Sequence, residues 1–173
     1  MIHMEIGGVR YEMDASAISA LRFRAEYGDS IINKIADCAS LDELEGQLLR
    51  MCHMMIPEAN RPELPAFAKI ARKDPEFIIK AQLARMALLD TDPRAPKAED
   101  DGTHERFDEY QVLALMACSG IDMGLIRELP IMHIVGIVQR TANLKDPDKA
   151  PKYRPMTDEE MAMLYPRRKK SNG

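Results

Sequence analysis

The chain has 173 residues, a length typical of one domain with or without a small satellite, and such a chain can bury a core without disulfides or a metal. Hydrophobic residues make up 46% and charged residues 30%, the balance of an ordinary globular protein, and the formal net charge of −4 argues against a protein that coats nucleic acid. No run approaches the roughly 18 apolar residues of a membrane span, so we expect no membrane contact.

Three widely spaced cysteines, Cys38, Cys52 and Cys118, form no C-x-x-C pair. This pattern predicts reduced thiols that pack as small apolar side chains in a reducing compartment. The first residues lack the basic region and long apolar run of a signal peptide. We therefore expect a cytoplasmic protein.

The first predicted element is a β-hairpin over residues 2–13. The dipeptide Gly7-Gly8 is typical of a two-residue turn, and an alternating apolar run flanks it on each side. Pairing across this turn places six apolar side chains on one face: Ile6 opposite Val9, Met4 opposite Tyr11, and Ile2 opposite Met13. A hairpin is marginal alone, so helices must cover that face.

The pattern then becomes helical. A helix capped by Asp14 or Ser16 is expected to end at Gly28, and another is expected to begin at Asp29. The side chains expected to face inward are Ile18, Leu21 and Ala25 in the first helix, and Ile31, Ile32, Ile35 and Cys38 in the second.

Three further helices are predicted before residue 90. A capping box at Ser40–Glu43 begins a helix whose buried stripe is predicted to be Leu44, Leu48, Met51, Cys52 and Met55. Residues 57–65 hold three prolines and predict a turn. A short helix follows with Leu64, Phe67 and Ile70, and Asp74-Pro75-Glu76 predicts a helix start. That helix is expected to bury Phe77, Ala81, Ala84 and Leu88.

Residues 1–90 are thus interpreted as one helical domain with an N-terminal hairpin, so that the fold class is mainly α (α+β). The charged, proline-containing segment 91–106 predicts a flexible linker. A second helical section is expected over 107–143, with helices beginning at Asp108, Asp122 and Pro130. Residues 144–173 predict an extended tail that contains a short amphipathic helix at 157–165.

Catalytic and metal-binding motifs are absent from the sequence. It has no phosphate loop, nucleophile elbow or zincin motif, and the nearest metal-like spacing, His104 with Asp108, is interpreted as a solvated helix start. We expect no catalytic residue, no cofactor and no metal, and we interpret the chain as a binding protein.

Methionine is abundant, with 13 residues, and clusters twice. Flexible thioethers suit adaptable binding surfaces, although methionines on an apolar stripe also fill cores. Both alternatives stay open for the first cluster. The candidate partner-binding residues are Met51, Met54, Met55, Met161, Leu164 and Tyr165.

Residues 107–140 leave a second function open, a helix-turn-helix-like DNA-binding regulator. A DNA-reading helix needs basic or amide side chains on its exposed face. The segment Met123–Leu129 offers only Arg127, which Glu128 balances.

A hairpin with Gly7-Gly8-Val9-Arg10-Tyr11-Glu12, the helix Leu21-Arg22-Phe23-Arg24-Ala25-Glu26-Tyr27-Gly28-Asp29 and a methionine-rich helix resemble the tail assembly chaperones of long-tailed (siphovirus-type) bacteriophages and prophages. The resemblance covers about residues 2–90, the span of one domain. It implies a chaperone that binds the tape measure protein, keeps it soluble and assists tail tube assembly in the host cytoplasm. Contact with the tail tube protein and formation of a homo-oligomer are compatible with that role, and specific nucleic-acid binding is not expected.

Overall fold

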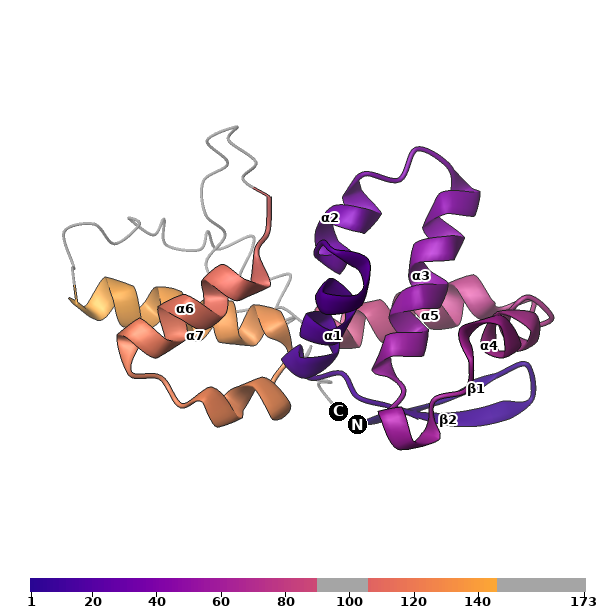
Figure 1. The fold of residues 1–173 in the computed structure, drawn as a ribbon, viewed down its shortest axis with the longest axis horizontal. Coiled ribbons are helices and arrows are strands. Elements are labelled where there is room, and N and C mark those ends of the chain that lie inside the picture. Colours follow the sequence, from indigo (N-terminus) through magenta and orange to yellow (C-terminus); the bar gives the residue numbers. More distant parts are fainter. Residues whose placement is uncertain (90–105, 146–173) are drawn as a thin grey trace, which may run out of the picture.

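A small hairpin and a set of short helices make up the fold in this computed structural model, which describes residues 1–89 and 106–145 (Figure 1). The elements up to residue 89 are β1 (Ile2–Ile6), β2 (Val9–Met13), α1 (Ala17–Tyr27), α2 (Ile31–Ala36), α3 (Leu41–Met55), the 3₁₀ turn η1 (Glu58–Asn60), α4 (Leu64–Ala71) and α5 (Phe77–Leu88). The elements after residue 106 are α6 (Glu109–Ser119), the 3₁₀ helix η2 (Met123–Arg127) and α7 (Ile131–Lys145). The predicted fold class, mainly α with an N-terminal hairpin, is confirmed.

The hairpin forms in the predicted register, with Ile6 opposite Val9. Gly7 and Gly8 both have positive φ, at 57° and 80°, as a two-residue turn with mirror-image geometry requires. Ile6, Tyr11 and Met13 are buried on the predicted face, whereas Val9 next to the turn is 41% exposed. The ring of Tyr11 meets Phe67 of α4 edge-on at 5.5 Å between centroids, so α4 covers part of the apolar face.

Helix α1 ends at Gly28 as predicted, but its inward face was predicted wrongly. Ile18 and Leu21 are only half-buried and Ala25 is exposed. The buried side chains are instead Ala17, Ser19, Ala20 and Phe23. The helix carries apolar side chains on more than one face, and it packs against α3 as well as against α6, η2 and α7. Sequence periodicity could not choose between these two packed sides.

Helix α2 is capped by Ser30 rather than by Asp29. The Ser30 hydroxyl accepts the N–H of Ile32, while Asp29 Oδ1 accepts the N–H of Ser30 and the side-chain amide of Asn33. Of the residues expected to face inward, Ile31 is fully buried; Ile32, Ile35 and Cys38 are half-buried.

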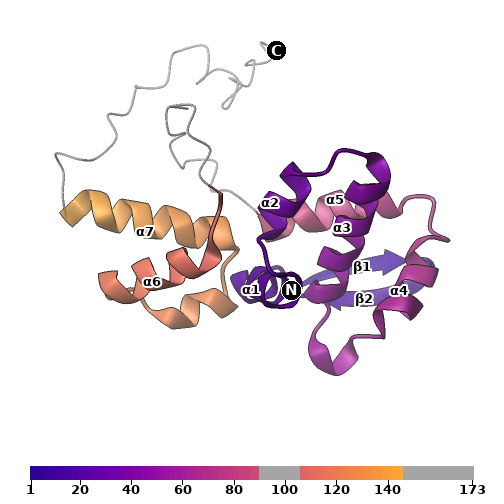
Figure 2. The ribbon, with the colours of Figure 1, turned by 45° about the horizontal axis from the view of Figure 1, so that its top comes forward.

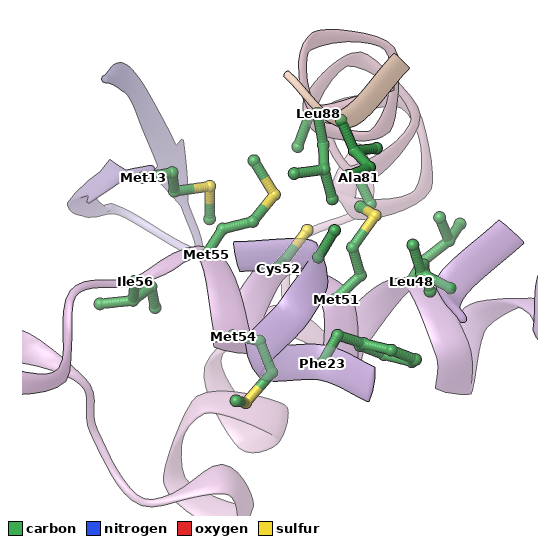
Figure 3. Close-up of a cluster of buried hydrophobic side chains, with 14 of the residues drawn as sticks. Met13, Phe23, Leu48, Met51, Cys52, Met54, Met55, Ile56, Ala81 and Leu88 are labelled. Carbon is green, nitrogen blue, oxygen red and sulfur yellow. The ribbon is translucent and has the colours of Figure 1, made fainter. Parts of the chain in front are cut away.

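Helix α3 is the central element, and it packs against α1, α2, α4 and α5. Its capping box is confirmed: Ser40 Oγ accepts the N–H of Glu43, and Glu43 Oε2 accepts the N–H of Ala39. The predicted stripe is buried, with Leu44 half-buried at its first turn. From Leu48 onwards every residue of the helix except Arg50 is buried, so this half of α3 is surrounded by protein (Figure 3).

Helix α5 buries the four side chains predicted from its sequence, Phe77, Ala81, Ala84 and Leu88. Its regular turns begin at Phe77, two residues later than expected. Asp74 still acts as a local cap, because its Oδ1 accepts the N–H of Glu76 at 3.0 Å. The proline-containing stretch before α4 forms the predicted turn, which includes the 3₁₀ turn η1.

The second helical section forms from the predicted starts. Asp108 caps α6, Gly120 ends it in the left-handed conformation, and Asp122 caps η2. Helix α7 continues to Lys145, two residues beyond the expected end. Both ribbon views place α6 and α7 beside α1, at the opposite end of the molecule from the hairpin (Figures 1 and 2). Their buried side chains belong to the same apolar cluster as those of α1 and α3.

A polar seam joins the second section to α1 and α2. Arg24 Nη1 lies 3.1 Å from Glu109 Oε2, and the Glu109 side chain is fully buried. Arg106 Nη2 lies 2.7 Å from both Asp29 Oδ2 and Asp37 Oδ2, which stand at the two ends of α2. Burial raises the pKa of Asp29, but hydrogen bonds from Asn33 and Arg106 prevail and hold it at about 2. The seam therefore fixes where the chain enters α6.

Two predictions fall on residues that the structure leaves undescribed. The linker at 91–106 lies outside the described residues except for Arg106, and so does the tail helix at 157–165. Among residues 1–89 and 106–145, β1 and β2 are the only strands.

Candidate partner-binding surface

The first methionine cluster lies in the core and not on a surface. The exposed fractions of Met51, Met54 and Met55 are 1%, 6% and 0%. Figure 3 shows them on α3 among side chains from β2, α1 and α5. Their selection as candidate contact residues is therefore corrected, because neighbouring helices and the hairpin cover all three side chains. The alternative that they fill the core is confirmed.

The second cluster, Met161 with Leu164 and Tyr165, lies outside the described residues. The structure gives these three candidates no position.

Cys52 and His53, neighbours on α3, are both buried. Burial raises the pKa of the Cys52 thiol to about 12, so it stays protonated at neutral pH. His53 Nε2 lies 2.8 Å from the carbonyl oxygen of Pro62, a structural contact. No group of three residues that could ligate a metal occurs within the described ranges, and none of the helices described there is long and apolar enough to cross a membrane.

The outer face of α5 carries an exposed apolar stripe. Ile79, Leu83 and Met86 are 66%, 56% and 67% exposed. They are spaced four and three residues apart, so they stand on one face of the helix, opposite the buried Ala81, Ala84 and Leu88. Because the inner face of α5 is already buried, a second apolar surface would be needed to cover these three exposed side chains. We call Ile79, Leu83 and Met86 the α5 stripe.

A shallow depression of about 360 Å³ lies beside the α5 stripe. Gln82 connects the two features, since it lines the depression and lies one turn from both Ile79 and Met86 of the α5 stripe. Leu41, at the start of α3, is 82% exposed and adds an apolar rim. The full lining consists of Ile35, Cys38, Ala39, Ser40, Leu41, Leu44, Gln82 and Arg85.

The position of α5 is set by a carboxylate at its start. Asp74 is 9% exposed, and its Oδ2 accepts the N–H of Gly7 at 2.8 Å and a hydrogen bond from Lys80 Nζ at 2.8 Å. These bonds tie α5 to the hairpin turn, while the buried face of α5 packs on α3. The α5 stripe is therefore carried by a helix that is fixed at its first turn and along its inner face.

Sequence reasoning missed this surface although the signal was present. The segment Phe77–Leu88 has apolar residues at helical spacing on two faces, and only the face that fills the core was predicted to have a role. A helix with two apolar faces is a recognisable sign of a binding helix once one face is known to be buried.

No protein-family model matches the chain significantly, and no curated protein or solved structure does so either.

Proposed function

We propose that this protein is a tail assembly chaperone of a long-tailed bacteriophage or prophage. It would act without catalysis, binding the tape measure protein and keeping it soluble while the tail tube assembles. The observation that carries the proposal is the α5 stripe, an exposed apolar face on a firmly anchored helix. The resemblance of residues 2–90 to such chaperones supplies the identity of the partner.

The α5 stripe fits a long helical partner because amphipathic helices dock by placing an apolar face against a complementary apolar surface. Three side chains give only a small contact, far below the roughly 800 Å² per partner of a stable interface. Each contact would therefore be weak and reversible. Several copies of the chaperone along one long partner would cover it, and growing tail tube could displace them one at a time.

Coexpression with a candidate tape measure protein tests the proposal. We expect the wild-type protein to move the partner from the insoluble to the soluble fraction and to copurify with it in several copies. The change Leu83→Ser removes the central side chain of the α5 stripe and should return most of the partner to the pellet. Leu83 is 56% exposed, so the change leaves the core intact.

The matched control is Leu144→Ser, which alters a leucine that is 83% exposed on α7. This variant should solubilise the partner as well as the wild type does. A partner that stays insoluble with the wild-type protein would contradict the proposal. A specific shift of a DNA fragment at physiological salt would favour the regulator instead.

A further inference from the structure

Arg85 lines the depression beside the α5 stripe. No carboxylate among the described residues neutralises its charge. None of the ion pairs among the described residues involves it. Its one hydrogen bond runs from Nη1 to Gln82 Oε1, at 3.2 Å. Its Nε is buried and has no hydrogen-bond partner. A guanidinium in this state can form further strong bonds with a carboxylate.

Within residues 1–89 and 106–145 no carboxylate pairs with Arg85, which favours a carboxylate supplied by a partner. Helix α5 contains no Asp or Glu between Phe77 and Leu88, and Glu76, which lies one turn before Ile79, has its carboxylate 3.5 Å from Lys80 Nζ. Lys80 is already paired with Asp74 and Glu76. Asp42 and Glu43 begin α3 but do not line the depression, and Glu43 accepts the Ala39 N–H. Arg85 is therefore the cation available to a bound partner.

Resting on the proposed function, we infer that this surface recognises an amphipathic helix with an acidic residue about one turn from its apolar anchors. The anchors cover Ile79, Leu83 and Met86, and the carboxylate enters the depression to pair with Arg85. Leu41 and Leu44 line the same depression, so a partner helix seated on it would shield the ion pair from water and strengthen it. Arg85 thus selects among amphipathic helices that would otherwise bind alike.

A second copy of this chain does not meet these requirements through its own α5. Two α5 helices packed stripe to stripe would bring two Arg85 side chains together, and the carboxylates at the start of each α5, Asp74 and Glu76, already bind Lys80. Like charges held close in an interface oppose association. The partner is therefore a helix of different composition from α5.

The test uses the full-length protein and two designed helical peptides of about 18 residues, or five turns. Both carry the same leucine stripe and a fluorescent label, and one has glutamates along the edges of the stripe where the other has lysines. Fluorescence anisotropy gives each Kd at low and at physiological salt. We expect the glutamate peptide to bind at least about fivefold more tightly, as one partly desolvated ion pair allows, and the preference to shrink with salt.

Variants then assign the preference to Arg85. Arg85→Gln should remove the difference between the two peptides, and Arg85→Lys should keep part of it. The matched control, Arg127→Gln, removes an exposed arginine from η2 and should leave the preference unchanged. Thermal melts followed by circular dichroism establish that each variant folds. The comparison of the two peptides on the wild-type protein needs no mutation. Equal affinities would therefore overturn the role of Arg85 even if Arg85→Gln fails to fold.

The outcomes separate this inference from the proposed function. Equal affinity of the wild type for both peptides, with Leu83→Ser weakening both, overturns the role of Arg85 and leaves the α5 stripe as a binding surface. A preference that survives in Arg85→Gln also overturns it. Absence of binding to either peptide overturns both the inference and the proposed use of the α5 stripe.

Discussion

The backbone N–H of Gly7 donates a hydrogen bond to Asp74 Oδ2 at 2.8 Å, across 67 positions of sequence. The turn of the hairpin and the first turn of α5 are thereby held by one carboxylate, which also binds Lys80. Asp74 is thus both a local cap and a tertiary contact. Losing it would loosen two elements at once.

Replacing Asp74 with Asn should lower the thermal midpoint of unfolding, and the size of this decrease should depend on pH. The hydrogen bond from Lys80, followed by that from Gly7, holds the pKa of Asp74 at about 2, below its usual value of 3.8. Because the folded-state pKa is depressed, the stabilisation is fully present above about pH 4 and is lost as the pH falls toward 2. The wild type should therefore exceed Asp74→Asn in thermal midpoint at pH 6 and approach it near pH 2.

A control for this comparison is Glu58→Gln, which alters an exposed carboxylate in η1. Its midpoint should follow that of the wild type across the same pH range. If the gap between wild type and Asp74→Asn stayed constant down to pH 2, the carboxylate charge would not be its source.

Alanine substitutions at Gly7 and Gly8 should lower the free energy of unfolding by different amounts, because one turn position is only strained in its backbone and the other is also crowded. Gly8→Ala should cost about 1–2 kcal/mol in free energy of unfolding, since an L residue is strained at its φ of 80°, but no atom obstructs a Cβ there. At Gly7 a Cβ would lie 2.7 Å from the backbone oxygen of Ile70, so overpacking should add about 1–3 kcal/mol. Urea denaturation measures both, and equal losses would contradict the close approach of Ile70.

Breaking the buried pair between Arg24 and Glu109 from one side should be more harmful than replacing both partners. Arg24→Met leaves the Glu109 carboxylate buried and unpaired, which should cost about 3–5 kcal/mol in free energy of unfolding. The double change Arg24→Met with Glu109→Leu should recover a large part of that loss. Chemical denaturation of the four proteins in a double-mutant cycle gives the coupling energy, and simple additivity would mean that the pair is not formed.

The three cysteines should react with a thiol reagent at different rates. Cys118 is exposed and Cys38 is half-buried, while Cys52 is buried and its thiol pKa is about 12. We expect Cys118 to react first and Cys52 only in denaturant. Mass spectrometry of timed DTNB reactions identifies each site, and rapid labelling of Cys52 under native conditions would mean that α3 is not enclosed as described.

Much of the fold could be predicted because local chemistry and periodicity agree. The Gly7-Gly8 turn fixes the register of the hairpin, and the Ser40 capping box fixes the start of α3. The three- and four-residue spacing of apolar residues in α3 likewise identifies buried side chains, since Leu48, Met51, Cys52 and Met55 are all buried.

The exposed α5 stripe could not be predicted in the same way, because spacing groups residues into faces without saying what covers each face. The buried face of α5 was predicted correctly, but only the structure shows that no described element covers Ile79, Leu83 and Met86 on its other face. The same ambiguity led to the wrong face for α1. The choice of Met51, Met54 and Met55 failed because α3 is enclosed by elements that come from distant parts of the chain.

The separation of methionines between core and surface gives the protein an uneven sensitivity to oxidants. Sulfoxide formation turns a flexible apolar side chain into a polar one, and it follows exposure. Met86 is 67% exposed on the α5 stripe, whereas Met51, Met54 and Met55 are enclosed. Dilute peroxide would therefore place a polar oxygen on the α5 stripe well before it reached the core, and a chain damaged in this way would stay folded while its outer apolar face was already altered.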